Sequence, residues 1–347
     1  GTEICDGVDN DCDGSIDQSP TPNNSPPSSD IPMISSSLGN DSFGGDLIAD
    51  VASTSDPDGD NVVLNYDWRQ QGQSIATLNM SFDTTNLCGV TDYSTHQNHG
   101  IINGSPTYAP GIKGQAMSFD DGVGSIEIEN ANLMSHDFTF SAWIYVEDST
   151  NPEPIFSQSS PSSVFLNEHF LFVEGGQLRF QSYYSTPNWS TIYSNEGIIP
   201  NQTWVHVAMT RDGNSVTLYV DGMPYHNEII FQNIPNGNNY IGSEGKNSSY
   251  ENRYFHGKID EVLVFDHVIK EDQILSLYNS GIPNNTIVSS GTEPSDNWEV
   301  AATPSDSYSD GITQISGIFE FQCANDDVDC DGIPSSEDCD DNDINAG

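Results

Sequence analysis

The chain has 347 residues, of which 35% are hydrophobic, so it can bury two or three modest cores but not one large core. Its 52 acidic and 8 basic residues give a formal net charge of −44. This charge would repel nucleic acids and anionic membranes, and it makes cations the expected partners. No apolar run approaches the roughly 20 residues that a membrane-spanning helix needs, so we expect a soluble chain.

One short motif occurs near both ends of the chain. Residues 5–14, CDGVDNDCDG, match residues 323–332, CANDDVDCDG, at both cysteines, the three alternate aspartates and the glycine. Alternate aspartates in a tight loop can direct their oxygens at one Ca²⁺ ion, and the glycine permits the sharp turn. Magnesium is less expected, because it keeps more of its waters. The spacing therefore predicts calcium-binding loops over residues 1–18 and 323–347, and the alternative is a solvated acidic loop.

The two predicted loops differ in their twelfth position, which closes the calcium shell. The C-terminal loop has Asp338 there, whereas the N-terminal loop has Pro20, which cannot ligate through its side chain, so another group must complete that shell. The expected ligands are Asp9, Asp11, Asp13, Ser15 and Asp17 in the first loop, and Asp327, Asp329, Asp331, the carbonyl of Ile333, and Asp338 in the second.

Both ends resemble thrombospondin type 3 repeats and related bacterial and archaeal repeats, through EICDGVDNDCDG at 3–14 and DCDDND at 338–343. The resemblance implies calcium binding by the loop aspartates and by Asp340. In those repeats a DCDDND segment precedes EICDGVDNDCDG in one run, so the end of one copy and the start of another would restore the pattern. We therefore expect head-to-tail association, with Asp338, Asp340 and Asn342 sharing calcium with the next copy and a fibre as the outcome. The alternatives are one unit of a longer polypeptide, or ends that simply fray.

The segments between the two ends predict an all-β protein with an interrupted domain. Residues 19–30 are rich in Pro, Ser and Asn and indicate a linker. Strand patterns fill 31–75 and 76–283, and 284–322 adds strands that are too few for a domain, so we expect them to complete the one begun at 31. A single helix is expected at 270–278, with Ile274, Leu275 and Tyr278 on one side.

Residues 76–283 resemble the LamG-like jelly-roll family, which is related in fold to concanavalin-type lectins and pentraxins. The motifs stand in the family's order: DYS leading to NHG at 92–100, GIKGQAMSFDD at 111–121, FTFSAWIYV at 138–146, TWVHVAMTRDGNSVTLYVDG at 203–222 and GKIDEVLVFDHVI at 257–269. The resemblance implies a jelly-roll sandwich with one structural calcium ion held by Asp92, Asp120 and Asp260, and Asp121 could take the place of Asp120.

The flanking segments 31–75 and 284–322 resemble immunoglobulin-like modules of the cadherin and PKD type. The motif SDPDGD at 55–60 precedes a strand that ends in YDW at 66–68, and DNWEVAATPSDSYSDG at 296–311 fits the late strands. The resemblance implies a split immunoglobulin-like sandwich that carries the jelly roll as an insertion. Asp56, Asp58 and Asp60 could bind a further calcium ion, and an acidic turn without metal is an equal alternative.

Six cysteines in an acidic chain predict disulfides and therefore an extracellular location. The internal repeat suggests that Cys5 pairs with Cys12 and Cys323 with Cys330, which leaves Cys88 and Cys339 to pair together or across molecules. An alternative pairs Cys330 with Cys339 and Cys88 with Cys323.

Aromatic residues offer the only hint of a ligand other than calcium. Tyr183, Tyr184 and Trp189 lie in a less regular segment, where they could stack on sugars or pack in the sheet, whereas Trp143 and Trp204 lie within alternating strands and are expected in the core. The sequence has no HExxH, GxSxG or P-loop motif, so we expect no enzyme. Two functions remain: a secreted, calcium-binding structural protein of an extracellular surface or fibre, or a calcium-dependent adhesin that binds glycans or other surface proteins.

Overall fold

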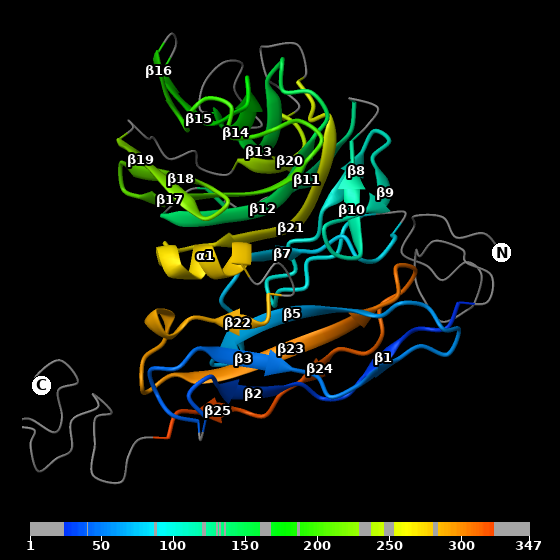
Figure 1. Ribbon diagram of the computed structural model, residues 1–347. Helices are drawn as coiled ribbons and strands as arrows, with labels where there is room; N and C mark the ends of the chain where they lie inside the picture. The colour runs from blue at the N-terminus through cyan, green and yellow to red at the C-terminus, as the bar shows by residue number, and fades with distance from the viewer. Residues whose placement is uncertain are drawn as a thin grey trace, which may run out of the picture.

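The protein consists of a two-sheet jelly roll and a smaller group of sheets, which lie at the top and bottom of Figure 1. This computed structural model describes residues 24–39, 41–86, 89–119, 123–129, 131, 133–134, 137–159, 168–185, 188–228, 237–245, 253–279 and 284–322. Strands dominate these ranges, which confirms the predicted all-β class.

The first sheet of the jelly roll has eight strands in the order β19-β18-β17-β12-β21-β10-β9, and β7 pairs with β21. These strands are β7 (Leu78–Met80), β9 (Thr107–Pro110), β10 (Gln115–Ser118), β12 (Phe138–Val146), β17 (Trp204–Asp212), β18 (Ser215–Val220), β19 (Met223–Glu228) and β21 (Gly257–Phe265).

The second sheet has seven strands in the order β16-β15-β14-β13-β20-β11-β8. These are β8 (Ile101–Asn103), β11 (Ser125–Ile128), β13 (Glu153–Ser159), β14 (Glu168–Glu174), β15 (Gln177–Ser185), β16 (Asn188–Tyr193) and β20 (Asn238–Ile241).

The main hydrophobic core fills the space between these two sheets. Phe140 of β12 stacks on Phe156 of β13, with ring centroids 4.8 Å apart, and so joins one sheet to the other. Side chains alternate between the two faces of a strand, so Leu171 and Val173 of β14 point into this core. The intervening residues of β14 lie on the opposite face, which we call the outer face of the seven-stranded sheet.

The segments before and after the jelly roll share two further sheets. One has the order β2-β3-β22, the other has the order β24-β23-β5-β6 with β25 on β23, and β1 pairs with β4. The β5–β23 ladder runs over eight residue pairs, from Val63↔Ser305 to Gln70↔Trp298. These elements are β1 (Ser28–Ser29), β2 (Met33–Ser36), β3 (Leu47–Asp50), β4 (Thr54–Ser55), β5 (Val63–Gln70), β6 (Gln73–Ser74), β22 (Thr286–Ile287), the 3₁₀ turn η1 (Ser289–Gly291), β23 (Asn297–Ser305), β24 (Gln314–Ile315) and β25 (Phe319–Glu320).

The predicted helix is present as α1 (Glu271–Asn279), which lies between the jelly roll and these flanking sheets (Figure 1). Ile274 and Leu275 do not share the buried side: Leu275 is 41% exposed, because a period of 3.6 residues places Ile274 and Leu277 on the buried face and turns Leu275 away. Trp143 is buried as expected, whereas Trp204, the first residue of β17, is only half-buried and packs against Tyr145 at the sheet surface. Within the described residues, no helix has the length and apolar character to cross a membrane.

A buried histidine lies in the eight-stranded sheet beside α1. His206 of β17 is 1% exposed, and its Nε2 is 2.9 Å from the Ser141 hydroxyl on the neighbouring strand β12. Burial lowers the pKa of this imidazole from its ordinary value of 6.5 to about 3. The folded protein therefore holds His206 neutral at a pH at which the unfolded chain protonates it.

We expect His206 to make the protein less stable in acid. The neutral imidazole contributes fully to stability above pH 6.5, and this contribution is lost as the pH falls towards about 3. Over that range the free energy of unfolding should fall by about 1.4 kcal/mol per pH unit. Urea unfolding at pH 7 and pH 4.5 should therefore show a smaller difference in the free energy of unfolding for His206→Gln than for the wild type. The exposed His267→Gln is the control and should keep the wild-type difference. An unchanged pH dependence in His206→Gln would contradict this assignment.

Candidate functional site

Among the side chains that the structure describes, the most exposed aromatic ring on the outer face of the seven-stranded sheet lies on its edge strand. Tyr193 of the edge strand β16 is 60% exposed and pairs in register with Arg179 of β15. The next pair on this face is Gln181 with Thr191. We call β15 and β16 the edge hairpin; its outer face presents the Tyr193 ring beside groups that can form hydrogen bonds.

The three predicted glycan-binding residues belong to the same edge hairpin. Tyr183 of β15 pairs directly with Trp189 of β16, one step beyond the Gln181–Thr191 pair, and Tyr184 lies where the register shifts. Because residues alternate along β16, Trp189 and Tyr193 belong to one face of the strand. Only the backbone of these three predicted residues is described, so their stacking on sugars stays a prediction.

A buried carboxylate organises the opposite end of the outer face. Glu127 of β11 is 4% exposed and accepts hydrogen bonds from Asn103 Nδ2 at 3.1 Å, Asn238 Nδ2 at 2.9 Å and Tyr240 Oη at 3.1 Å. Burial, together with the charge of Glu127, raises the pKa of Tyr240 to about 12, so the phenol remains a donor at neutral pH. Sequence reasoning missed this group, because Glu127 alternates with Ile126 and Ile128 as any outward-facing residue of a strand would.

Two of the predicted calcium ligands of the jelly roll, Asp92 and Asp260, each accept hydrogen bonds from the backbone of a different loop. The Asp92 carboxylate accepts the backbone N–H groups of Asn79 at 2.8 Å and Asn98 at 2.7 Å, and also the Ser94 hydroxyl at 2.7 Å. Asp260 of β21 accepts the N–H of Ile112 at 2.9 Å. Both carboxylates therefore already fix backbone turns, and these contacts leave fewer oxygen lone pairs for a cation.

The acidic turn of the flanking sheets shows a similar arrangement. Asp56 Oδ1 accepts the backbone N–H groups of Asp58 at 2.8 Å and Asp60 at 2.9 Å, and Asp58 accepts the N–H of Ser25 at 2.6 Å. Partial desolvation, with the charges of Asp56, Asp306 and Asp58, raises the pKa of Asp60. The carboxylates thus lie close enough to interact, and a calcium ion at this turn stays a prediction.

Most of the predicted metal and disulfide residues lie outside the described residues. These are Asp120, all six cysteines and every ligand of the two terminal loops. Within the ranges that the structure does describe, no three His, Cys, Asp or Glu side chains are grouped so that they could hold a metal ion. The calcium sites and disulfide pairings therefore stay predictions.

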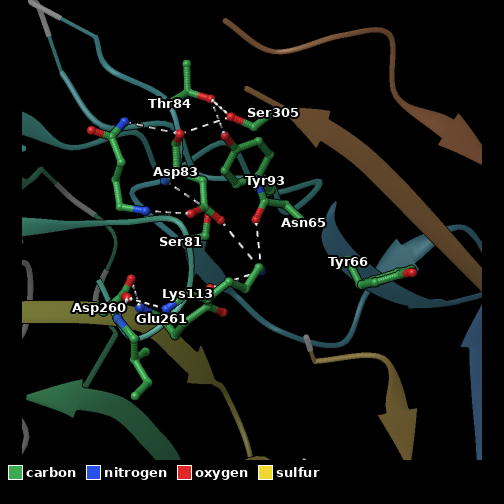
Figure 2. Close-up of polar contacts among 12 residues, drawn as sticks. Asn65, Tyr66, Ser81, Asp83, Thr84, Tyr93, Lys113, Asp260, Glu261 and Ser305 are labelled. Atoms are coloured by element: carbon green, nitrogen blue, oxygen red, sulfur yellow. Dashed lines mark hydrogen bonds and ion pairs between the residues drawn. The ribbon is translucent and has the colours of Figure 1, made fainter. Parts of the chain in front are cut away.

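Buried charges join the jelly roll to the flanking sheets, as Figure 2 shows. Lys113, in the turn between β9 and β10, lies 3.6 Å from Asp83 Oδ2 and 3.1 Å from Glu261 Oε1, and it donates to Asn65 Oδ1 of β5 at 3.3 Å. A Cβ on Gly114 would overlap Asp83 Oδ1, so this approach requires glycine. Burial raises the pKa of Asp83 to about 7, while Lys113 opposes that shift.

Hydroxyl groups extend this interface network to the end of β23. Ser305 donates to the carbonyl of Asp83 at 3.0 Å, and Tyr93 donates to Asp310 Oδ1 at 3.0 Å. Thr84 contacts both Ser305 and Asp310 (Figure 2 draws Thr84, Ser305 and Tyr93). The network therefore holds the two parts of the protein in one orientation.

Comparison with protein families identifies the jelly roll. Residues 120–275 match the family Laminin_G_3, described as the concanavalin A-like lectin/glucanases superfamily, which confirms the predicted jelly-roll domain. The sequence matches no curated protein.

Several solved structures are similar to this chain. One is domain 4 of AbnA, a GH43 extracellular arabinanase from Geobacillus stearothermophilus, in complex with arabinotriose, at 20% identity over 60% of this chain and 100% of that chain, with a TM-score of 0.46. Another is the binding domain of botulinum neurotoxin DC in complex with SialylT, at 15% identity over 60% and 52% of the two chains, with a TM-score of 0.46. A third is the binding domain of Paraclostridial Mosquitocidal Protein 1, at 16% identity over 59% and 52%, with a TM-score of 0.47. The chain spans about half the length of these two toxin domains.

The interface network predicts a strong effect of removing its only cation. Lys113→Met would leave the buried Asp83 and the partly buried Glu261 without this partner, and breaking a buried ion pair typically costs about 3–5 kcal/mol. The exposed Lys270→Met is the matched control and should change the free energy of unfolding by less than about 0.5 kcal/mol. Calorimetry measures both effects, and equal melting temperatures for the two variants would show that the network does not stabilise the interface.

Proposed function

We propose that this chain is a non-catalytic carbohydrate-binding protein of an extracellular surface and that the outer face of the edge hairpin holds the ligand. The observation that carries the proposal is the exposure of Tyr193 beside Arg179, in line with Thr191 and Trp189. An aromatic ring offers an apolar surface to a sugar, and the neighbouring polar groups can bind its hydroxyls. The match of residues 120–275 to a lectin and glucanase superfamily supports this function.

The surroundings of Glu127 favour binding over hydrolysis. Most glycoside hydrolases use two carboxyl groups that flank the scissile bond, at a separation of roughly 5–10 Å. Here the cross-strand neighbours of Glu127 are Ile101 on one side and Tyr240, then Ser157, on the other, and none of them is acidic. Glu127 is also held by three hydrogen bonds. Its arrangement suits a structural carboxylate that shapes the outer face.

A structural role in a surface or fibre is the second part of the proposal. The interface network and the two chain crossings between the jelly roll and the flanking sheets favour a rigid unit that presents its ligand site in a fixed direction. We propose that the terminal loops bind calcium and that calcium mediates self-association. The repeated aspartate spacing supports this part of the proposal.

Replacement of Tyr193 tests the sugar-binding face. Tyr193→Ala should weaken binding of the oligosaccharide that the wild type prefers on a glycan array by about tenfold, which corresponds to about 1.4 kcal/mol. Tyr308→Ala is the matched control, because Tyr308 is 43% exposed but lies in the flanking sheets. Equal losses in the two variants, or no glycan bound by the wild type, would contradict the proposed site.

Calcium removal tests the terminal loops. We expect elemental analysis to find several calcium ions and EDTA to lower the melting temperature, because one site saturated at a hundred times its Kd contributes about 2.7 kcal/mol. The double variant Asp329→Asn with Asp331→Asn should lose calcium while the jelly-roll transition survives. Asp266→Asn, at an exposed carboxylate, should lose none. A calcium-free protein with an EDTA-insensitive melting curve would rule out the loops as calcium sites.

A further inference from the structure

Two aromatic rings and a lysine form a row on the face of the eight-stranded sheet against which α1 packs. Tyr145 of β12 pairs in register with Trp204 of β17 on one side and with Lys258 of β21 on the other. The adjacent residues of the three strands belong to the main core: Ile144, Val205 and Ile259. Because side chains alternate along a strand, the three residues of the row lie on the opposite face. We call this set the aromatic–lysine row.

The aromatic–lysine row lies beside the end of α1 and is open to solvent. On this face the Trp143 ring of β12 stacks on Tyr278 of α1, with ring centroids 5.9 Å apart, and the helix ends at Asn279. Tyr145 is the next residue of β12 on the same face. Each of the three residues of the row keeps part of its surface exposed. A ligand can therefore reach them without any opening of the core.

The side chains of the row contact one another but no other polar group of the described residues. Lys258 Nζ lies 5.2 Å from the centroid of the Tyr145 ring, and the Tyr145 and Trp204 ring centroids are 5.7 Å apart. Within the described ranges, no hydrogen bond or ion pair involves any of these three side chains. Several other cations each contact a carboxylate: Arg69, Lys113, Arg179 and Arg253. Lys258 is instead held over an aromatic ring, so its charge is available to a ligand.

We propose that the aromatic–lysine row binds an acidic oligosaccharide, with a sugar ring against Trp204 and a sugar carboxylate on Lys258. The ammonium and the indole N–H are donors only, and the phenol is both a donor and an acceptor, so the set is rich in donors and suits a carboxylate. The row crosses two inter-strand spacings, about 10 Å, which suits two linked sugar units. This inference rests on the proposed function and names an acidic ligand at a second surface.

The acidity of the protein opposes such a ligand only at short range. At an ionic strength of about 0.15 M, charges more than about 8 Å apart are largely screened, so the distant carboxylates have little effect. The neighbouring carboxylate on this face is Glu147, which lies two residues beyond Tyr145 on β12, roughly 7 Å along the strand. Glu147 already accepts a hydrogen bond from Gln202 Nε2 at 3.1 Å. The contact with Lys258 is therefore expected to dominate at the row.

Replacement of Lys258 and of Trp204 tests the two parts of the row separately. An array of uronate- and sialate-bearing oligosaccharides identifies the acidic probe that the wild type binds best, and titration calorimetry then compares this probe with its carboxyl-reduced form. Lys258→Met should weaken binding of the acidic probe by at least about tenfold, because it removes a charge-assisted contact, and should leave binding of the reduced form unchanged. Trp204→Ala should weaken binding of both forms, because it removes the stacking surface.

The exposed Lys270→Met is the matched control and should bind both probes as the wild type does. Lys258 is only partly buried, and methionine keeps most of its apolar length, so Lys258→Met should keep the wild-type melting temperature.

The outcomes separate this inference from the function on which it rests. Wild-type affinity of Lys258→Met for the acidic probe would overturn the inference, and so would equal binding of the acidic and reduced forms by the wild type. If the wild type binds only neutral oligosaccharides and Tyr193→Ala loses them, the inference fails while the edge hairpin remains the ligand site. If the wild type binds no oligosaccharide, both fail. A loss in Lys258→Met that is confined to the acidic probe, with unchanged binding of that probe by Tyr193→Ala, supports the inference.

Discussion

The β5–β23 ladder is the constraint on which the rest of the structure depends. It pairs residues 63–70 with residues 298–305, so it can form only when the whole jelly roll between them bridges a short distance. The entropic cost of closing a loop grows only slowly with its length, and a folded insertion lowers it further by holding its ends together. Here Thr77 at the start of the jelly roll donates its N–H to the carbonyl of Val264 near its end, at 2.7 Å. We infer that the flanking sheets fold on a jelly roll that is already formed.

Because side chains alternate between the two faces of a strand, each strand of the seven-stranded sheet contributes both to the core and to the outer face. On β15, Leu178 and Phe180 fill the core, whereas Arg179 and Gln181 lie on the outer face. At Ser182 the core face changes from apolar to polar without any change of register. A rigid sheet thus holds every group of the candidate sites, and the precision of these sites derives from the core beneath them.

The sequence predicted local patterns well and distant pairings poorly. FTFSAWIYV alternates as a strand should, and the DGN turn of TWVHVAMTRDGNSVTLYVDG indicates a hairpin, so β12, β17 and β18 were predictable. The partners of Lys113 were not, because residues 83 and 261 approach it only through the packing of separate strands. Asp92 and Asp260 show a different limit: the sequence does not reveal that these two carboxylates accept backbone N–H groups, whether or not they also bind calcium.

The insertion of the jelly roll also determines how a pulling force would pass through the molecule. Tension along the chain enters the described part near β1 and leaves near β25, and both strands belong to the flanking sheets. The jelly roll is inserted in the chain between β6 and β22. The β5–β23 ladder joins the two flanking segments directly, so it offers the force a path that does not pass through the jelly roll. While that ladder holds, the load bypasses the edge hairpin, so tension along the chain would leave the proposed ligand site undistorted.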